Sequence, residues 1–387
     1  MTALAGGGRG HQGQLKPRSG PAATASGAGP AGAGAGQAGT AVVRPTRLGP
    51  SHVLVAAGFL LSAALVSVLV GPADLPAKGV LEEIAGKLPF VHLRAGLGTT
   101  GDVVLWQLRM PRMVLGGLVG AMLAVAGASY QGVFSNALAD PYLLGVASGA
   151  GLGATLAIVY APGESVGPVS ALPAAAFAGA LVAVAATFAL ARPKSYERSA
   201  ASLVLAGVAV AAFFTAVQTF IQQEQNSVDL TVVYSWILGG LSTAGWSQVE
   251  LVLPYVLVAA AALFACRRLL DVLAVGDEEA TSVGVRAQRV RLVVVAAATL
   301  GTAAAVSVSG LIGFVGIIVP HTIRLLAGPS YRRIIPLSLM YGAGFLILAD
   351  LLARTVLSPQ EVPLGVVTAF LGAPFFLIVL RQARRTG

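Results

Sequence analysis

Ten apolar stretches, separated by short charged or glycine-rich segments, set the tightest limit on how this chain of 387 residues folds. A helix needs about 20 apolar residues to cross the hydrocarbon core of a bilayer. Only 11% of the residues are charged, whereas a soluble domain carries roughly 25%. The sequence therefore predicts an all-α, polytopic membrane protein. We expect spans at residues 53–70, 113–133, 141–160, 169–191, 200–221, 248–266, 292–309, 311–327, 334–353 and 363–380.

The basic residues are distributed unevenly over the segments between these spans. Ten spans leave both termini on one side of the bilayer, and most of the 25 Lys and Arg residues fall in segments on that side. Basic loops stay preferentially in the cytoplasm. We therefore expect cytoplasmic N- and C-termini, and we interpret the basic clusters as topology signals, with no nucleic acid as partner.

Residues 1–49 differ in composition from the rest of the chain. They are rich in Gly, Ala, Pro and Ser and contain no acidic residue. Such a segment buries too little apolar area to offset the entropy lost on ordering. We therefore predict a disordered cytoplasmic tail before a ten-helix domain at 50–387. The single cysteine, Cys266, cannot by itself form a disulfide framework or a metal site, and we expect no catalytic residue and no bound metal.

A stripe of small residues crosses the span at 113–133. Small side chains let helix backbones approach closely in lipid, where no hydrophobic drive exists between helices. The stripe therefore predicts tight packing of this helix. It consists of Gly116, Gly117, Gly120, Ala124, Gly127 and Ala128.

Two further stretches have more than one interpretation. The amphipathic piece Val232–Leu241 contains Trp236 and predicts a short helix at the outer membrane surface. Gln131, Ser135 and Asn136 fall near the inner end of their span. They either line an inner gate or only cap and turn the chain.

The longest polar interruption in the second half of the chain is the loop at about 267–291. It contains five arginines and the acidic cluster Asp277, Glu278 and Glu279. Topology alone explains the arginines but not the acids. We interpret the loop as a docking surface for a soluble partner; the alternative is a solvated loop without one.

The energy source for a transporter of this kind is also constrained. The chain lacks a G-x-x-x-x-G-K-[ST] sequence, so it cannot cradle the phosphates of ATP itself. Ion-coupled carriers place ionisable residues at membrane depth, and only Asp350 lies clearly inside a predicted span. This scarcity favours a partner ATPase, and an ion-coupled secondary carrier is the alternative from another class.

Residues 108–153 carry several motifs in a fixed order. Arg-Met-Pro-Arg at 109–112 is followed by the Gly/Ala-rich helix, Gln131, and Asn-Ala-Leu-Ala-Asp-Pro at 136–141. This pattern resembles the FecCD-type permeases of ATP-binding-cassette (ABC) importers for iron–siderophores and cobalamin, which usually have Pro in place of Ala137. The second half resembles them at 282–285, 313–321, 332–333, 349–350, 361–368 and 372–374.

The resemblance covers about residues 50–382 and implies the permease fold of a type II ABC importer. It implies a second permease subunit, identical or a sister chain, in the bacterial cytoplasmic membrane. An ABC ATPase dimer would bind in the cytoplasm and carry the ATP and Mg, while this chain binds no cofactor. A substrate-binding protein outside would deliver a ferric siderophore, and cobalamin or haem is the alternative.

The resemblance also places the contacts with these partners. The arginines Arg109, Arg112 and Arg354 would dock the binding protein, because a planar guanidinium grips a carboxylate with two hydrogen bonds. Snorkelling to lipid phosphates is the alternative for them. Two short helices, at 277–284 and 285–291, would couple to the ATPase. The coupling residues are Asp277, Glu278, Glu279, Ser282, Gly284, Val285, Arg286 and Arg289.

Overall fold

The computed structural model describes residues 48–87, 97–166, 169–191 and 197–386. The predicted tail at 1–49 lies outside these residues except for its last two. Seven helices of the described chain are long and apolar enough to cross a membrane, and three shorter apolar helices match the remaining predicted spans. The all-α prediction is confirmed. The ten helices are α1 (Pro50–Leu69), α4 (Met110–Val133), α5 (Val146–Tyr160), α6 (Ala171–Ala191), α7 (Glu197–Gln223), α9 (Trp246–Leu273), α11 (Ala287–Ser309), α12 (Val315–Ala327), α13 (Tyr331–Thr355) and α14 (Leu364–Thr386).

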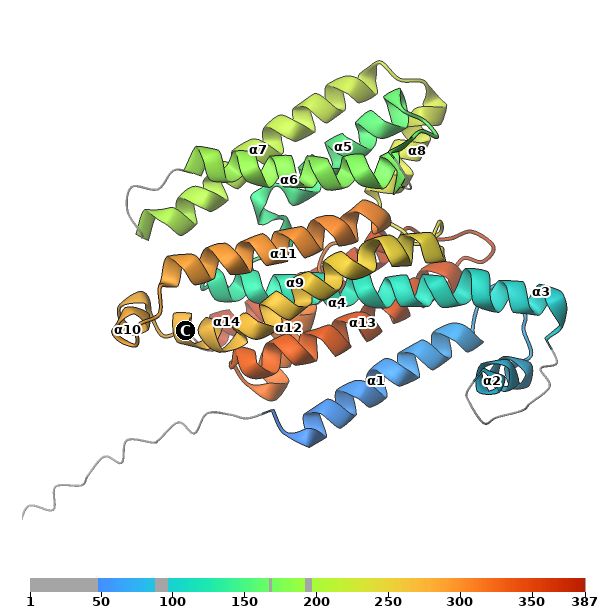
Figure 1. The fold of residues 1–387 in the computed structure, drawn as a ribbon, viewed down its shortest axis with the longest axis horizontal. Helices are drawn as coiled ribbons and strands as arrows, with labels where there is room; N and C mark the ends of the chain where they lie inside the picture. The colour runs from blue at the N-terminus through green and yellow to red at the C-terminus, as the bar shows by residue number, and fades with distance from the viewer. Residues whose placement is uncertain (1–47, 88–96, 167–168, 192–196, 387) are drawn as a thin grey trace, which may run out of the picture. The chain divides into compact units, whose positions relative to one another are not determined.

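Short elements connect these helices and define the two ends of the bundle. The predicted helix at 232–241 exists but begins and ends earlier in the chain, as α8. Helix α10 lies at one end of the long helices and α3 at the other (Figure 1), and we call these the α10 end and the α3 end. The short elements are α2 (Ala77–Gly86), α3 (Gly98–Val103), the π-helix η1 (Val104–Arg109), the 3-10 helix η2 (Pro141–Leu144), the antiparallel strands β1 (Ser165–Val166) and β2 (Val169–Ser170), α8 (Ser227–Ile237) and α10 (Asp277–Ser282).

Helix α4 is the centre of the bundle and packs against α9, α11, α12 and α13. Together with α3 and η1 it forms one helical segment, Gly98–Val133, of 36 residues. At 1.5 Å per residue this segment is about 54 Å long, whereas the hydrocarbon core is about 30 Å thick. The segment is therefore longer than the hydrocarbon core is thick. Its start was predicted at residue 113, because hydropathy falls at Arg109 and Arg112 although the helix continues.

The predicted stripe of small residues is the surface on which α4 packs. A Cβ atom on Gly120 would lie 2.3 Å from the carbonyl oxygen of Gly342 in α13. A Cβ atom on Gly127 would lie 2.0 Å from the carbonyl oxygen of Gly316 in α12. Both distances are far below van der Waals contact. The glycines therefore allow three backbones to touch, as expected for helices in lipid.

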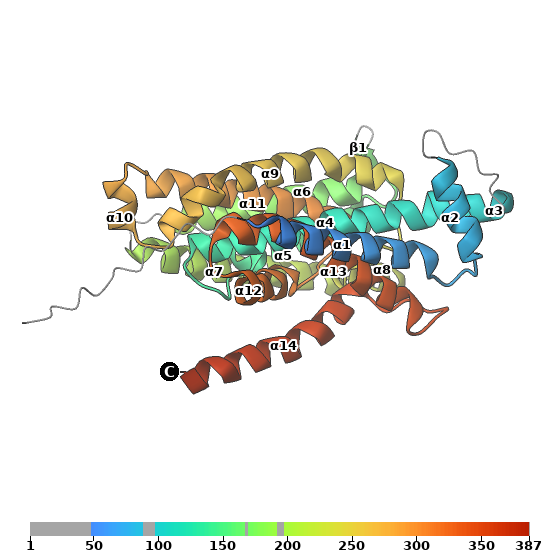
Figure 2. The same ribbon diagram turned by 90° about the horizontal axis from the view of Figure 1, so that it is seen from below.

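Helix α14 packs on the bundle much less than α4 does. It leaves the other helices at an angle in Figure 2, and its known helix neighbours are α12 and α13. Gly372 accommodates the ring of Phe314, whose own backbone has a left-handed φ of 68°. Phe370 is 77% exposed and Leu377 is 60% exposed. A large part of α14 therefore presents apolar side chains outward.

Candidate functional site

Arg112, in the first turn of α4, binds two carboxylates from distant parts of the chain. Its Nε donates to both carboxylate oxygens of Asp350, at 3.1 and 3.0 Å, and its Nη2 donates to Oδ1 at 2.8 Å. Its Nη1 and Nη2 donate to the two oxygens of Glu361 at 2.7 and 3.1 Å. The Asp350 side chain is 3% exposed and that of Glu361 is 38% exposed. Arg112 thus joins a fixed acid to an accessible one.

Arg109 and Arg354 bind the C-terminal end of α1. The Nη1 of Arg109 donates to the carbonyl oxygens of Val68 and Leu69 at 2.6 and 3.2 Å. The Nη2 of Arg354 donates to the carbonyl oxygen of Ser67 and, at 2.8 Å, to its Oγ. The last carbonyls of a helix have no partner inside the helix and carry the negative end of its dipole. The two arginines therefore cap α1.

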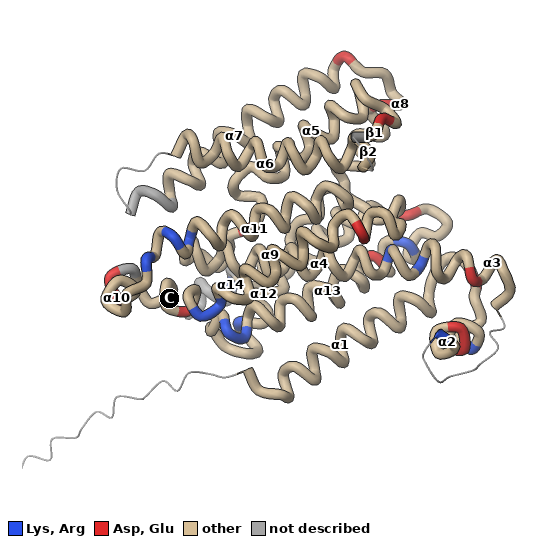
Figure 3. The backbone as a smooth tube through the Cα atoms, in the orientation of Figure 1, with Lys and Arg blue, Asp and Glu red and all other residues tan. Residues whose placement is uncertain are grey.

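The structure brings all three predicted docking arginines to the α3 end. Arg354 lies 3.7 Å from Asp350, so this carboxylate is shared between Arg354 and Arg112. Arg109 and Arg354 are each 5% exposed. Figure 3 shows a basic cluster toward the α3 end, apart from the basic residues at the α10 end. Docking by these arginines stays a prediction, and Arg112 is the one that reaches an accessible acid.

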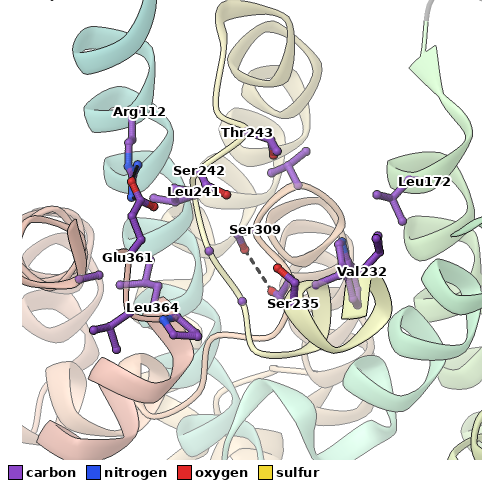
Figure 4. A pocket seen from close by; sticks show the side chains of 18 of the residues that line it. Arg112, Leu172, Val232, Ser235, Leu241, Ser242, Thr243, Ser309, Glu361 and Leu364 are labelled. Atoms are coloured by element: carbon purple, nitrogen blue, oxygen red, sulfur yellow. Dashed lines mark hydrogen bonds and ion pairs between the residues drawn. The ribbon is translucent and has the colours of Figure 1, made fainter. Parts of the chain in front are cut away.

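A pocket of about 550 Å³ adjoins this cluster (Figure 4). Arg112 and Glu361 form one side of it, and the end of α8 with the loop 239–243 forms another. The remaining lining comes from 308–310, 362–364, Leu172 and Ala353. Hydroxyl groups and one indole ring project from these segments and can contact a polar organic ligand. They belong to Ser235, Trp236, Ser242, Thr243 and Ser309.

The predicted coupling loop forms the α10 end of the molecule. Asp277 begins α10, and Ala280 in the same helix is fully buried. Around Ala280 an open concavity of about 1030 Å³ is lined by charged and polar residues together with Gly284, Val285 and Ala287. Val285 is half-buried. The exposed predicted coupling residues are Glu278, Glu279, Ser282, Gly284, Arg286 and Arg289.

The prediction of a second short helix at 285–291 is wrong. Arg286 is the N-cap of α11, and Ala287 already belongs to this long helix. Gly284 has a left-handed φ of 80°, so the backbone turns there and α10 does not continue into α11. Beyond Ala287 the sequence contains no glycine or proline until Gly301, so the helix runs without interruption into the apolar span.

Polar side chains at the α10 end join four of the ten apolar helices, α4, α9, α12 and α13. Asp271 of α9 accepts a hydrogen bond from the backbone N–H of Tyr331, which begins α13. Arg324 of α12 donates to the Tyr331 hydroxyl at 3.1 Å and to Oε1 of Gln131 at 3.3 Å. Gln131, in α4, donates to the carbonyl oxygen of Gly316 at 3.1 Å. Gln131 therefore ties helices together and does more than cap α4.

The turn after α4 is built by side-chain capping. Ser135 has a left-handed φ of 49°, and Asn136 Oδ1 accepts a hydrogen bond from the backbone N–H of Leu138 at 2.9 Å. This is the cap-and-turn interpretation of the two residues. Asp140 accepts from the N–H of Tyr142 at 2.8 Å and caps η2. Burial raises the pKa of Asp140 to about 6, and the hydrogen bond from Tyr142 opposes that shift in part.

Sequence reasoning did not predict the partners of Asp350 and Glu361. The sequence marks Asp350 as the one acid clearly inside a predicted span and Glu361 only as part of the motif at 361–368. Each is paired with a helix 238 or 249 residues away. The sequence did contain a signal for the pairing of Asp350. An acid buried in a span needs a cation, and Arg112 and Arg354 fall at the same predicted end of their spans.

The sequence model of the FecCD transport family matches residues 59–382. The chain belongs to the FecCD transport family. As a FecCD permease it is an ABC-transporter subunit that spans the membrane several times and is not itself catalytic. The fold agrees: a solved chain described as a metal-chelate type ABC transporter in an inward-facing conformation superposes with a TM-score of 0.74 at 26% identity, covering 86% of this chain and all of that one.

Relatives of this FecCD permease are named for different substrates. The cobalamin import permease BtuC of Halobacterium salinarum is 39% identical over 343 residues, which is 87% of this chain and 91% of the relative. The Fe(3+)-citrate import permease YfmE of Bacillus subtilis is 34% identical, covering 86% and 96%. The iron(3+)-hydroxamate import permease FhuG of the same organism is 36% identical, covering 74% and 87%.

Proposed function

We propose that this FecCD permease is the membrane subunit of an ATP-driven importer that moves ferric siderophores through the bacterial cytoplasmic membrane. A binding protein delivers the substrate at the α3 end, and an ABC ATPase dimer with ATP and Mg works at the α10 end. The observation that carries the proposal is the placement of two charged surfaces at opposite ends of one bundle. Helix α4 and its partners connect them.

The α10 end fits a soluble partner. Val275 is 71% exposed and Val283 is 66% exposed, beside the exposed Glu278 and Arg289. Exposed apolar side chains between charged ones are typical of a protein interface, because they contribute free energy only when a partner buries them. Asp271 links this end directly to α13. Movement of α10 by an ATPase would therefore be transmitted to the long helices, which is how a lever between rigid elements works.

The orientation follows from charge. The α10 end holds the basic clusters predicted to lie in the cytoplasm, together with the C-terminal end of α14. The α3 end then faces outward. Trp106 and Trp246 lie there, and the indole N–H of Trp246 donates to the carbonyl oxygen of Trp106 at 2.8 Å. Tryptophans are enriched at membrane interfaces, which supports this placement.

A second permease subunit would cover the outward face of α14. Phe370 and Leu377 are exposed there, and Leu205 and Phe213 of α7 are 72% and 66% exposed. A helix that lines the transport path needs a protein surface on the other side of the path. A helix on the outside of the bundle can instead be covered by lipid alone. A second copy or a sister chain at α14 would enclose the path that begins at the pocket beside Arg112.

Cobalamin is the second candidate substrate. The relative that carries the cobalamin name matches at 39% identity, compared with 34% and 36% for the two relatives named for iron chelates. The pocket lining of hydroxyls and one indole suits either ligand, because both present a polar organic shell. The substrate therefore has to be decided by uptake.

Transport into proteoliposomes tests the proposal. The permease is reconstituted with its ATPase, and uptake of iron-55 ferric hydroxamate, iron-55 ferric citrate and labelled cyanocobalamin is measured with the binding protein. We expect uptake of an iron chelate that requires ATP, and we expect this uptake to persist when an ionophore is added. Uptake that needs an ion gradient and no ATP would establish a secondary carrier. ATP-dependent uptake of cyanocobalamin alone would replace the siderophore by cobalamin.

A further inference from the structure

We propose that Glu361 occupies the place on Arg112 that a carboxylate of the binding protein takes on docking. Docking then exchanges one carboxylate for another and releases the segment that leads into α14. The inference rests on the proposed docking of a binding protein at Arg112. In this proposal Glu361 competes with the binding protein's carboxylate for Arg112.

The hydrogen bonds of Arg112 leave no free edge on its guanidinium. Nε and Nη2 face Asp350, while Nη1 and Nη2 face Glu361. A guanidinium has five N–H groups in a fixed plane, and two bidentate carboxylates occupy both of its edges. One N–H of Nη1 remains, so a third carboxylate can form two hydrogen bonds with Arg112 only where one of the two present leaves.

Of the two acids, Glu361 is the one that can leave. Asp350 is 3% exposed, sits inside α13 and also lies 3.7 Å from Arg354. Glu361 is 38% exposed and lies in the loop between α13 and α14, where Arg112 is the one hydrogen-bond partner that the described residues give its side chain. The Arg112 side chain is itself only 13% exposed, but water can solvate the Glu361 carboxylate when it leaves, whereas Asp350 would stay buried without its cation. The exchange therefore takes place at Glu361.

Glu361 is tied to the first turn of α14 by a short stretch of backbone. The N–H of Val362 donates to the carbonyl oxygen of Ala353 at 2.9 Å, and that of Leu364 to Gly239 at 2.9 Å. The N–H of Gly365 donates to the carbonyl oxygen of Leu238 at 3.1 Å. A Cβ on Gly365 would lie 2.3 Å from that oxygen, so the contact needs glycine. These bonds and Glu361 hold the start of α14.

Release of Glu361 therefore has two consequences in the same place. The residues 361–364 form part of the wall of the pocket of about 550 Å³ and face the end of α8 across it. Without Glu361 on Arg112, this wall is no longer attached to α4. The first turn of α14 is then held by the three backbone bonds and the buried Leu364 without the ion pair, and the rest of the helix is lightly packed. Arrival of the binding protein would loosen the pocket into which that protein delivers its substrate.

Removal of the competitor should strengthen docking. The affinity of a ligand rises when the group that occupies its site in the free protein is removed. We expect Glu361→Gln to bind the binding protein about threefold to tenfold more tightly than the wild type, which is at most about 1.4 kcal/mol. Arg112→Gln should lose most of the binding, because it removes the shared partner. Glu164→Gln removes another exposed acid from the α3 end and should bind as the wild type does.

The measurement uses the permease–ATPase complex in nanodiscs and the binding protein that supports uptake in the proteoliposome assay, with dissociation constants at two salt concentrations. Tighter binding by Glu361→Gln, with Glu164→Gln unchanged, supports the exchange. Unchanged or weaker binding by Glu361→Gln overturns it, while binding by the wild type keeps the docking proposal. No binding by the wild type would reject docking itself.

A second measurement does not depend on docking. Hydrogen exchange of residues 362–366 is followed without binding protein, because the amides of Val362, Leu364 and Gly365 report the backbone bonds of this segment. We expect faster exchange there in Glu361→Gln than in Glu164→Gln, with no change in α13. Equal exchange in both variants would overturn the release of α14, and faster exchange across the whole chain would mean that Glu361 only stabilises the fold.

Discussion

The carboxylate of Asp271, near the end of α9, accepts a hydrogen bond from the backbone N–H of Tyr331, the first residue of α13. It also accepts one from the hydroxyl of Ser330 at 2.8 Å, and Arg332 lies 3.6 Å away. The acid therefore caps a helix to which it does not belong. It holds the start of α13 to the helix that leads into α10.

Asp271→Ala should destabilise the protein by about 0.5–2 kcal/mol, which is the range for loss of a helix N-cap. The variant should also transport more slowly, because α10 loses its attachment to α13. Thermal unfolding in detergent and uptake in proteoliposomes measure the two effects. Glu278→Ala, an exposed acid on α10, should leave the unfolding temperature unchanged. Equal stability of both variants would remove the capping role of Asp271.

Asp350→Asn should cost more, about 3–5 kcal/mol, because it breaks a buried pair and leaves the arginines short of a counter-ion. The Asp350 side chain is 3% exposed, and Arg112 and Arg354 both face it. Unfolding temperatures of Asp350→Asn and of the exposed control Glu164→Gln decide the matter. If Asp350→Asn is as stable as the wild type but does not transport, Asp350 acts in ion coupling, as in a secondary carrier, and not as a structural counter-ion.

Gly127→Ala should destabilise the bundle by about 1–3 kcal/mol, because the new methyl group meets backbone that cannot move aside. Its Cβ would lie 2.0 Å from the carbonyl oxygen of Gly316. Gly58 in α1 is the matched control, since a Cβ there meets nothing within 4 Å. Gly58→Ala should be neutral or stabilising. Similar unfolding temperatures for the two variants would contradict the close packing of α4 and α12.

Asp140 should make stability depend on pH. Its folded pKa is about 6 against a reference of 3.8, so the folded protein keeps a proton that the unfolded chain has lost between these values. Stability should therefore fall as pH rises from about 4 to 6 and level off above, by on the order of 1–3 kcal/mol. Asn caps helices as well as Asp does. Asp140→Asn should unfold at a higher temperature than the wild type at pH 7.5 and close to it at pH 4.5, and parallel curves would exclude this role.

Hydropathy was enough to find all ten apolar helices, because lipid leaves a chain few ways to satisfy its backbone. It misplaced the start of the segment at Gly98–Val133, since charge ends a hydrophobic run without ending a helix. The separate helix at 285–291 was implied by the family resemblance, and there the chain instead enters α11 at Ala287. The positions of charged residues alone do not predict where a helix begins or ends.

The contacts of the site could not be predicted, for a different reason. Arg109 and Arg354 were recognised as arginines on the outer side, but their partners are carbonyl groups at the end of α1, which no sequence pattern marks. The pairing of Arg112 with Glu361 spans 249 residues. It depends on where α14 begins relative to α4, and such long-range geometry appears only in the fold.

Accessibility labelling tests most directly whether the two ends face opposite sides of the membrane. In a Cys266→Ala background, Ser282→Cys places a thiol on exposed α10 and Glu164→Cys places one in the exposed turn before β1. A membrane-impermeant maleimide is added to intact cells and then to permeabilised cells. The account predicts labelling of Glu164→Cys in intact cells and of Ser282→Cys only after permeabilisation. Labelling of Ser282→Cys from outside would contradict it.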